Sequence, residues 1–344
     1  MTQKKRYSLA TIASELGVSK SAVSFVLNGN ARSRRISPEL EQRIKEYCKK
    51  YNYQPNIHAQ RINGVHINNI GILLDRDVVP YEKTPYREYN IASVIGGIAD
   101  AAAEAGYRVS CQFHSADMSD DVVFNWIENK EIGGLIYYGL VIPQRWIDFF
   151  RQQNFRTVGI SVDPVCGLPC VNVDNYTASY QLTSRLVGKG HRKFMYIAGI
   201  AKAYPGKERY RGFRDALSHS KILFDEANLL PGEFDRHAAA QLVRERWMRN
   251  ALDVDAIVCA NDNMAVGVIQ ILNDAGIAVP DRIAVAGADN IDDCEVISPS
   301  LTTFDYMPFE QGEEAFRLLK GLISGECEPH NIVLNTTISW RRSC

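Results

Sequence analysis

The sequence lacks an uninterrupted apolar run long enough to cross a lipid bilayer. It also lacks the apolar core of a signal peptide, because no such run follows the basic residues of the N-terminal stretch MTQKKRYSLA. These two absences argue against a membrane-embedded protein and against an exported one. We therefore expect a soluble, cytoplasmic protein.

Closely paired cysteines are lacking as well. The chain has eight cysteines, but they are scattered along it. The nearest two, Cys166 and Cys170, have neither a second pair nor histidines near them, so their spacing is poor evidence for zinc. Thiols in a reducing compartment stay free. We predict no metal site, no disulfide and no cofactor.

The usual motifs of an enzyme are lacking too. The first apolar strand pattern, in IGILLDRD, is not followed by a glycine-rich phosphate-binding fingerprint. No Ser/His/Asp or Cys/His set stands out, and His191 and Asp262 are far apart in the sequence. We predict no catalytic residues, because an α/β fold alone does not indicate catalysis.

Net charge is close to zero, at −1, but the charges are unevenly distributed. Residues 1–65 hold twelve Lys and Arg against four Asp and Glu, a balance of about +8. The other residues hold 27 basic and 36 acidic side chains, a balance of about −9. A basic head on an acidic body suits a head that contacts a polyanion.

The basic part contains the pattern of two short helices joined by a tight turn. Ser8 can cap the first helix, and Gly17 follows its last apolar position, where a left-handed residue ends a helix at least steric cost. The apolar face of this helix has helical spacing and comprises Leu9, Ile12, Ala13 and Leu16.

The second helix follows Ser19 and ends at Asn28-Gly29. Its sequence predicts a buried face of Ala22, Val23, Val26 and Leu27, and another face of Lys20, Ser21, Ser24 and Phe25. In a helix-turn-helix the second helix lies in the DNA major groove. An ordinary helical hairpin is the alternative, but the small polar residues and the lysine favour DNA binding. A third helix is expected from Ser37-Pro38 to Lys50.

From Asn69 onward, short apolar strand patterns alternate with helical patterns. This alternation predicts parallel sheets with helices on both faces. Two units of similar size follow one another and meet near residues 161–174. A ligand in such proteins binds in the crevice at the carboxyl ends of the strands.

Taken together, the chain resembles the LacI/GalR family of bacterial transcriptional regulators. The resemblance covers essentially the whole chain. The matching blocks stand in the family's usual order: LATIASELGVSKSAVSFVLNGN, YNYQPNIHAQRI, NNIGILL, VDNYTASYQLTSRLVGKGHRKFMYIAG, ERYRGFRDAL, ANDNMAVGVIQILNDAGIAVPDRIAVAGADN and SPSLTTF.

The resemblance implies an all-α helix-turn-helix head at residues 1–54 and a hinge helix with its linker at 55–66. It implies a periplasmic-binding-protein-like α/β body at 67–344, which binds an effector and forms the dimer. The body is expected to contain two doubly wound parallel-sheet subdomains: subdomain 1 at about 67–162 plus 292–323, and subdomain 2 at about 163–291 plus 324–344.

On the DNA side, the resemblance implies that Lys20, Ser21 and Ser24 read base edges, with Ser19 and Asn28 near phosphates. The chain has Phe25 where the family usually has the arginine of VSRVLN. Phenylalanine cannot grip guanine as arginine does, but it can touch a thymine methyl group. Packing on the surface of the head is an equally good interpretation of Phe25.

Residues 56–63, which begin with Asn56, match the family's hinge helix. In the family, paired hinge helices enter the minor groove and a leucine wedges between central base pairs, and Ile62 falls at that leucine. The segment is too short for a stable helix by itself, so a linker that orders only with a partner is expected. Packing within the linker is the alternative interpretation of Ile62.

For the body, the resemblance implies effector contacts from Arg209 and Asp262, and more weakly from Asp163. Guanidinium and carboxylate groups can fork onto the vicinal hydroxyls of a sugar. The alternatives are a surface ion pair for Arg209 and a helix N-cap for Asp262. Tyr86 and Tyr89 are weak candidates for stacking on a sugar ring, and a solvent-facing position is as good an interpretation.

The function implied is a transcriptional repressor, bacterial and nucleoid-associated, in which a small molecule, expected to be a sugar, controls affinity for double-stranded DNA. A homodimer would bind a pseudo-palindromic operator, because the family's C-terminal tetramerising helix is not recognisable after ISWRRSC. The alternatives are a non-regulatory sugar-binding protein of the same fold and a corepressor-type regulator of another metabolite. The basic head argues against the first.

Overall fold

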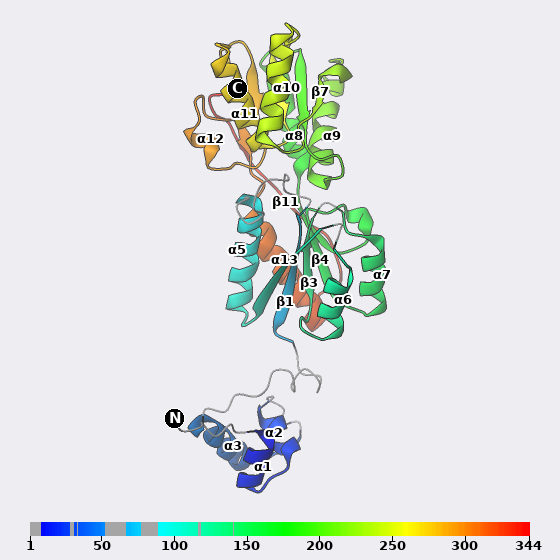
Figure 1. The fold of residues 1–344 in the computed structure, drawn as a ribbon, viewed down its shortest axis with the longest axis vertical. Coiled ribbons are helices and arrows are strands. Elements are labelled where there is room, and N and C mark those ends of the chain that lie inside the picture. The colour runs from blue at the N-terminus through cyan, green and yellow to red at the C-terminus, as the bar shows by residue number, and fades with distance from the viewer. Residues whose placement is uncertain are drawn as a thin grey trace. The chain divides into compact units, whose positions relative to one another are not determined.

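The computed structural model describes residues 8–27, 31–32, 34–51, 67–76, 89–115, 118–139 and 141–344. The chain divides into two compact units, a head at residues 1–67 and a body at 68–344. Figure 1 shows a head made of helices and a body made of two α/β lobes. None of the helices in the described ranges is long and apolar enough to span a membrane.

The head contains three helices, α1 (Leu9–Leu16), α2 (Lys20–Leu27) and α3 (Pro38–Lys50). The Ser8 hydroxyl accepts a hydrogen bond from the Thr11 amide at 3.1 Å and caps α1. Gly17 ends α1 in the left-handed conformation, with φ at 66°, where a Cβ would be costly. Ser37 caps α3 in the same way, by accepting from the Leu40 amide. The predicted helix-turn-helix is confirmed.

All three helices contribute to the core of the head. Ile12, Val23 and Ile44 are fully buried, one from each helix. Ala31 in the loop after α2 is buried with them. The core is small, so each buried side chain carries a large share of the stability of the head.

The first lobe of the body is built on a parallel sheet, whose strands lie in the order β11-β5-β4-β3-β1-β2. Its strands are β1 (Asn69–Asp75), β2 (Arg108–His114), β3 (Leu135–Tyr138), β4 (Thr157–Ile160), β5 (Cys170–Val173) and β11 (Ile332–Leu334). Helices α5 (Tyr89–Glu104) and α13 (Pro308–Ser324) cover one face, and α6 (Asp121–Glu128) and α7 (Gln144–Gln152) cover the other (Figure 1). The side chains of β1 point to the two faces in turn: Ile70 and Ile72 pack against the first pair of helices, and Leu73 packs against the second.

The second lobe is a smaller parallel sheet in the order β7-β6-β8-β9. Its strands are β6 (Phe194–Ala198), β7 (Leu229–Pro231), β8 (Ala256–Cys259) and β9 (Ala284–Ala286). The helices around it are α8 (Asn175–Gly188), α9 (Tyr204–His219), α10 (Arg236–Met248), α11 (Asp262–Asp274) and α12 (Asp293–Val296), with a short 3-10 turn at Glu226–Asn228. Another 3-10 turn, at Pro164–Cys166, connects β4 and β5 of the first lobe. Two parallel-sheet lobes confirm the predicted fold class.

The chain passes from one lobe to the other after β5, after β10 (Thr303–Phe304) and after β11. Strand β10 pairs antiparallel with β12 (Ile338–Ser339) beside the second lobe.

The subdomain boundaries expected from the sequence need correction. Strands β5 and β11, expected in subdomain 2, pair with each other and with β4 in the first sheet. Cys294 and Leu301, expected in subdomain 1, are buried in the core of the second lobe. The physical reason is that parallel pairing joins strands that are distant in sequence, so the residues of a short apolar strand do not say which sheet it joins.

Candidate functional sites

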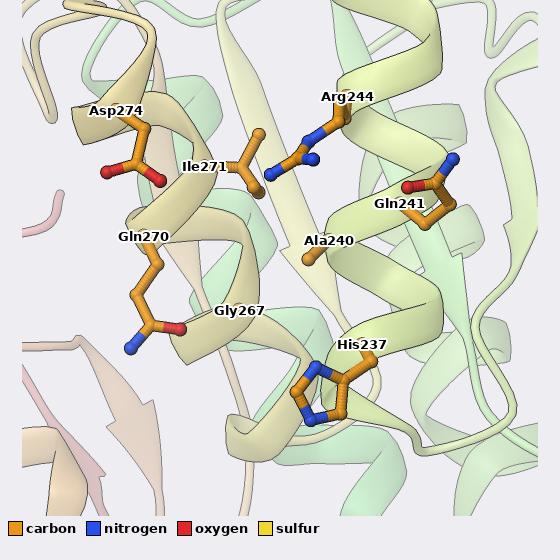
Figure 2. Close-up of a pocket in the computed structure, with 8 residues that line it drawn as sticks. All are labelled: His237, Ala240, Gln241, Arg244, Gly267, Gln270, Ile271 and Asp274. Carbon is orange, nitrogen blue, oxygen red and sulfur yellow. The ribbon is translucent and has the colours of Figure 1, made fainter.

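An open groove of about 560 Å³ lies between α10 and α11 (Figure 2). Its lining is mixed in chemistry and consists of His237, Ala240, Gln241, Arg244, Gly267, Gln270, Ile271 and Asp274. None of the predicted site residues that the structure describes lines this groove. The polar groups that converge on one another lie elsewhere, around Arg209.

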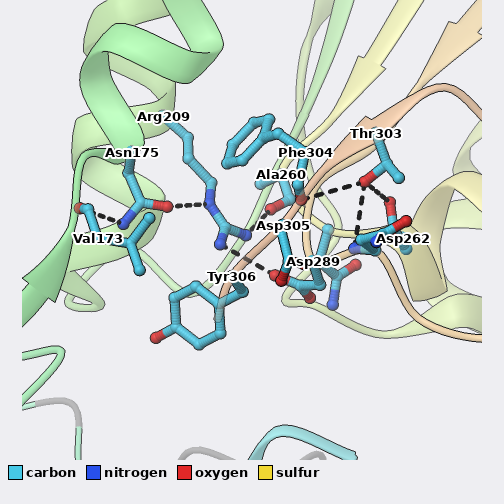
Figure 3. Close-up of polar contacts among 12 residues, drawn as sticks. Val173, Asn175, Arg209, Ala260, Asp262, Asp289, Thr303, Phe304, Asp305 and Tyr306 are labelled. Carbon is cyan, nitrogen blue, oxygen red and sulfur yellow. Dashed lines mark hydrogen bonds and ion pairs between the residues drawn. The ribbon is translucent and has the colours of Figure 1, made fainter. Parts of the chain in front are cut away.

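Arg209 on α9 is the centre of a buried polar cluster (Figure 3). Only 3% of it is exposed. Its Nη2 lies 2.9 Å from Asp289 Oδ1, its Nε donates to Asn175 Oδ1 at 2.7 Å, and its Nη1 donates to the Ala260 carbonyl at 2.6 Å. A guanidinium has five N–H donors, and these contacts among the described residues use three of them.

Asp289, the partner of Arg209 in this ion pair, has a strained backbone conformation. Its φ is 125°, a value that a residue with a side chain rarely adopts. The strain is held by flanking backbone bonds, since the Asp289 amide donates to Phe304 O at 2.8 Å and the Tyr306 amide donates to Asp289 O at 3.3 Å. Strain of this kind persists where the surroundings over-determine it, and it clusters at functional sites.

The cluster sits at the carboxyl ends of the strands. Ala260 follows β8 directly, Asp289 comes three residues after β9, and Asn175 begins the helix that follows β5. The rings of Phe304 and Tyr306, on the segment that crosses between the lobes, lie 5.3 and 5.0 Å from the Arg209 guanidinium. Open α/β sheets bind ligands at this edge, so the cluster occupies the position expected for a ligand site.

A contact from the first lobe reaches the same region. Ser161 follows β4 with φ at 58°, and its Oγ accepts a hydrogen bond from the Tyr306 hydroxyl at 2.5 Å. Burial raises the pKa of Tyr306 to about 12, so this hydroxyl keeps its proton at neutral pH. Tyr306 therefore touches the arginine of one lobe and a strand end of the other.

Asp262 lies near this cluster but points into the second lobe. It is 0% exposed. Its Oδ1 accepts from the Thr303 hydroxyl at 2.7 Å, and its Oδ2 accepts from the Ile291 amide at 3.2 Å and the Cys294 thiol at 3.1 Å. Burial raises the pKa of Asp262, and these hydrogen bonds oppose the rise. The carboxylate is used to join strand ends, so this geometry does not support the predicted effector contact.

The helix-cap interpretation of Asp262 is wrong by one residue. Asn261 caps α11, because its Oδ1 accepts from the Met264 amide at 2.9 Å. The residues that sequence reasoning missed are Asp289 and Asn175, the side-chain partners of Arg209. The available signal for Asp289 was its place just after the apolar run IAVAGA.

The structure describes two of the three weaker effector candidates, Asp163 and Tyr89. Asp163 caps the 3-10 turn that follows β4, where it accepts from the Val165 amide at 3.0 Å. The pKa of Glu208, next to Arg209 on α9, is raised first by burial and in part by the Asp163 charge, which places Asp163 near that helix. Tyr89 opens α5 and is 43% exposed. Tyr86 lies outside the described residues.

On the head, the residues predicted to read bases, Lys20, Ser21 and Ser24, all lie on α2. The Ser19 hydroxyl accepts from the Ala22 amide at 3.1 Å and caps the helix, while Lys20 and Ser21 are exposed. Ser24 and Phe25 are half-buried, and the guanidinium of Arg34 lies over the Phe25 ring. The predictions for Asn28, Asn56 and Ile62 fall outside the described residues.

Comparison with known proteins gives matches in both units. A family model described as bacterial regulatory proteins, lacI family, matches residues 8–56, and one described as a periplasmic binding protein-like domain matches residues 183–344. The HTH-type transcriptional regulator CelR of Thermobifida fusca is 27% identical over the full length of both chains.

Two solved structures extend the likeness to three dimensions. A transcriptional regulator CelR–cellobiose complex has a TM-score of 0.73 at 25% identity and covers 98% of this chain and 100% of its own. The lac repressor dimer bound to operator and the anti-inducer ONPF has a TM-score of 0.82 at 20% identity, covering 98% of this chain and 99% of its own. The second likeness shows the fold.

Proposed function

Because the chain belongs to the lacI family of bacterial regulatory proteins, it is a DNA-binding transcriptional regulator, and we propose that it is a repressor controlled by a small molecule bound at Arg209. The observation that carries this proposal is the buried Arg209–Asp289 ion pair at the carboxyl ends of the strands. Burying a charged pair costs desolvation free energy, so such a pair is weak evidence for a role in stability. We therefore assign this pair to binding of a polar effector.

The effector we propose is a sugar. Arg209, Asp289 and Asn175 together offer N–H donors and carboxylate or amide acceptors within one cluster. Each hydroxyl of a sugar both donates and accepts a hydrogen bond, so a cluster that holds donors and acceptors together can bind two neighbouring hydroxyls. The cellobiose bound to the related CelR structure supports a sugar of some kind.

Within this site we assign the contacts differently from the sequence-based prediction. Asp289 takes the role expected of Asp262, because Asp289 faces Arg209 and Asp262 faces Thr303. Asp163 approaches from the first lobe, and Tyr86 and Tyr89 stay predictions for the ring face of the sugar.

Regulation follows from the two-lobe architecture. The chain passes between the lobes after β5, β10 and β11, so a ligand that contacts both lobes favours one degree of closure. An effector shifts operator affinity only by its differential affinity for the two states. We propose that closure alters the hinge segment at residues 55–66, and through it the fit of two heads to an operator.

On the DNA side we propose a homodimer on a pseudo-palindromic operator, with Lys20, Ser21 and Ser24 of each α2 reading bases. The lac repressor structure, described as a dimer bound to operator, supports this assembly. Asn28, Asn56 and Ile62 stay predicted contacts. The site of action is then the bacterial cytoplasm, at the nucleoid.

The test is a fluorescence-anisotropy titration of the purified protein on a family-type palindromic operator, with and without a panel of sugars. We expect tight binding that one sugar weakens. Asp289→Asn should bind the operator but need at least about tenfold more sugar for the same response, since a charge-assisted bond is lost. Asp281→Asn, which changes an exposed carboxylate, is the matched control.

Two results would contradict the proposal. A normal sugar response in Asp289→Asn would move the effector site away from Arg209. Equal affinity of the wild-type protein for the operator and for random duplex would contradict the operator itself. Binding that a ligand strengthens would indicate a corepressor.

A further inference from the structure

Phe25 belongs to the face of α2 that carries the predicted DNA contacts. Residues four apart lie above one another on a helix, so Phe25 stands over Ser21, which is exposed. Val23 and Val26 take the opposite, buried face. The half-buried ring of Phe25 leaves apolar surface in contact with water, which is unfavourable unless another group covers it.

The ring supports an arginine from the next loop. The Arg34 guanidinium carbon lies 5.0 Å from the centroid of the Phe25 ring, within the range of a cation–π interaction. Arg34 itself is exposed. The contact therefore brings a charged group from outside the helix onto the face that α2 would present to DNA.

The turn that carries Arg34 is tied to the core of the head. The Ile36 amide donates to the Ala31 carbonyl at 3.0 Å, and the Arg35 amide donates to the Arg32 carbonyl at 3.1 Å. Ala31 is buried among the core residues. An anchored turn loses less entropy when it binds, because its backbone is already ordered.

The chemistry of the pair favours base reading. A ring can occupy only the flat face of a guanidinium, so the N–H groups at its edge stay available in their fixed fork. That fork matches O6 and N7 of guanine in the major groove, which is the commonest specific contact between an arginine and a base. A contact with phosphate would add affinity without sequence reading.

We propose that Phe25 and Arg34 form one recognition unit, in which the ring holds the guanidinium of Arg34 against a guanine of the operator half-site. Phe25 then makes no base contact of its own. This inference rests on the proposed DNA-binding function and adds to it a specificity-determining residue outside the helix-turn-helix.

The experiment selects binding sites from a pool of randomised DNA duplexes with the full-length protein and its variants. Arg34→Ala and Phe25→Ala should each lose preference for guanine at the same motif position. Their affinity ratio for the selected site over random duplex should fall roughly 10- to 100-fold. The double variant should lose no more than either single variant, because both remove one unit.

Three further variants separate the roles of ring, fork and charge. Phe25→Tyr keeps the ring and should keep the guanine preference, which guards against misfolding as the cause of loss. Arg34→Lys keeps the charge but not the fork, so it should lose the preference. Arg32→Ala removes a charge from the same loop and should weaken binding to all duplexes alike, with an unchanged motif.

Each alternative outcome overturns a different part. If Arg34→Ala behaves like Arg32→Ala, Arg34 contacts phosphate and the inference is wrong. If Phe25→Ala changes preference at a thymine and Arg34→Ala does not, Phe25 reads the base itself. If the wild-type protein selects no motif at all, the DNA-binding function fails, and the recognition unit fails with it.

Discussion

The hydroxyl of Tyr306 donates a hydrogen bond to Ser161 Oγ at 2.5 Å, across the boundary between the two lobes of the body. The Ser161 hydroxyl in turn donates a hydrogen bond to Gln311 Oε1 on α13 at 2.9 Å, so the hydrogen bonds continue into the first lobe. The ring of Tyr306 lies 5.0 Å from the Arg209 guanidinium. One side chain thus contacts the candidate effector site and the interior of the other lobe.

We expect Tyr306→Phe to uncouple effector binding from operator binding. The variant keeps the ring beside Arg209 but loses a buried hydrogen bond, worth about 1 kcal/mol. The effect of the sugar on operator affinity should shrink roughly fivefold, with little change in sugar affinity. Calorimetry of sugar binding and anisotropy of operator binding measure the two quantities.

Tyr137→Phe is the matched control for this variant. The Tyr137 hydroxyl donates to the Val141 carbonyl at 3.1 Å and so stays within the first lobe. An equal loss of coupling in both variants would assign the effect to general destabilisation.

We expect Gly97→Ala to destabilise the first lobe by about 1–3 kcal/mol through overpacking. Gly97 lies where α5 meets α13, and a Cβ there would overlap the carbonyl oxygen of Phe309, a backbone atom that cannot rotate away. At the neighbouring Gly96, a Cβ would lie 3.6 Å from the Phe309 ring, an ordinary contact. Gly96→Ala should therefore be neutral or slightly stabilising, since alanine favours helices. Urea unfolding compares the two, and similar free energies of unfolding would contradict the close approach.

We expect Ile44→Ala to unfold the head while the body stays intact. Ile44 is fully buried in a core of few residues, and its truncation costs roughly 2–5 kcal/mol. Specific operator binding should be lost, whereas sugar binding should be unchanged. Leu40→Ala on the same helix, where the side chain is half-buried, should lose less. If Ile44→Ala also abolished sugar binding, the two units would not be independent.

We expect Asp262 to make stability fall as pH rises. Burial raises its pKa in the folded protein, so the native state keeps a proton that the unfolded chain, with a carboxyl pKa of about 3.9, has already released. Where the native state holds more protons, the free energy of unfolding decreases with increasing pH.

Asp262→Asn should remove this contribution, although its amide also disturbs the bonds from Ile291 and Cys294. The difference in free energy of unfolding between wild type and variant should therefore change across the window that begins near pH 4. Urea unfolding at a series of pH values measures it, and parallel profiles would show an ordinary pKa for Asp262.

Local patterns in the sequence predicted local structure well. The Ser8 cap, the Gly17 terminus and the Ser37-Pro38 start describe interactions within one turn, and the structure has all three. The sheet to which β5 or β11 belongs depends on partners far away in the chain, so the sequence pattern could not decide it.

In the candidate site, too, the sequence indicated single residues but not the partners that the fold brings to them. Arg209 was found through the resemblance, but Asp289, its ion-pair partner, was not, because its position depends on the course of the backbone after β9. For Phe25 the sequence left a thymine contact and surface packing open. The arginine over its ring is nine positions further along and comes near only through the fold of the loop.

The interleaving of the two lobes also governs how the body is made. The first lobe lacks α13 and β11 until residue 334 has been synthesised. The second lobe is finished later still, since the Val285 amide donates to the Ser343 carbonyl at 2.9 Å. Domains usually fold in turn as they leave the ribosome, but here both lobes wait for the same last stretch of chain. A chain broken off before that stretch therefore lacks strands and backbone bonds that complete both lobes.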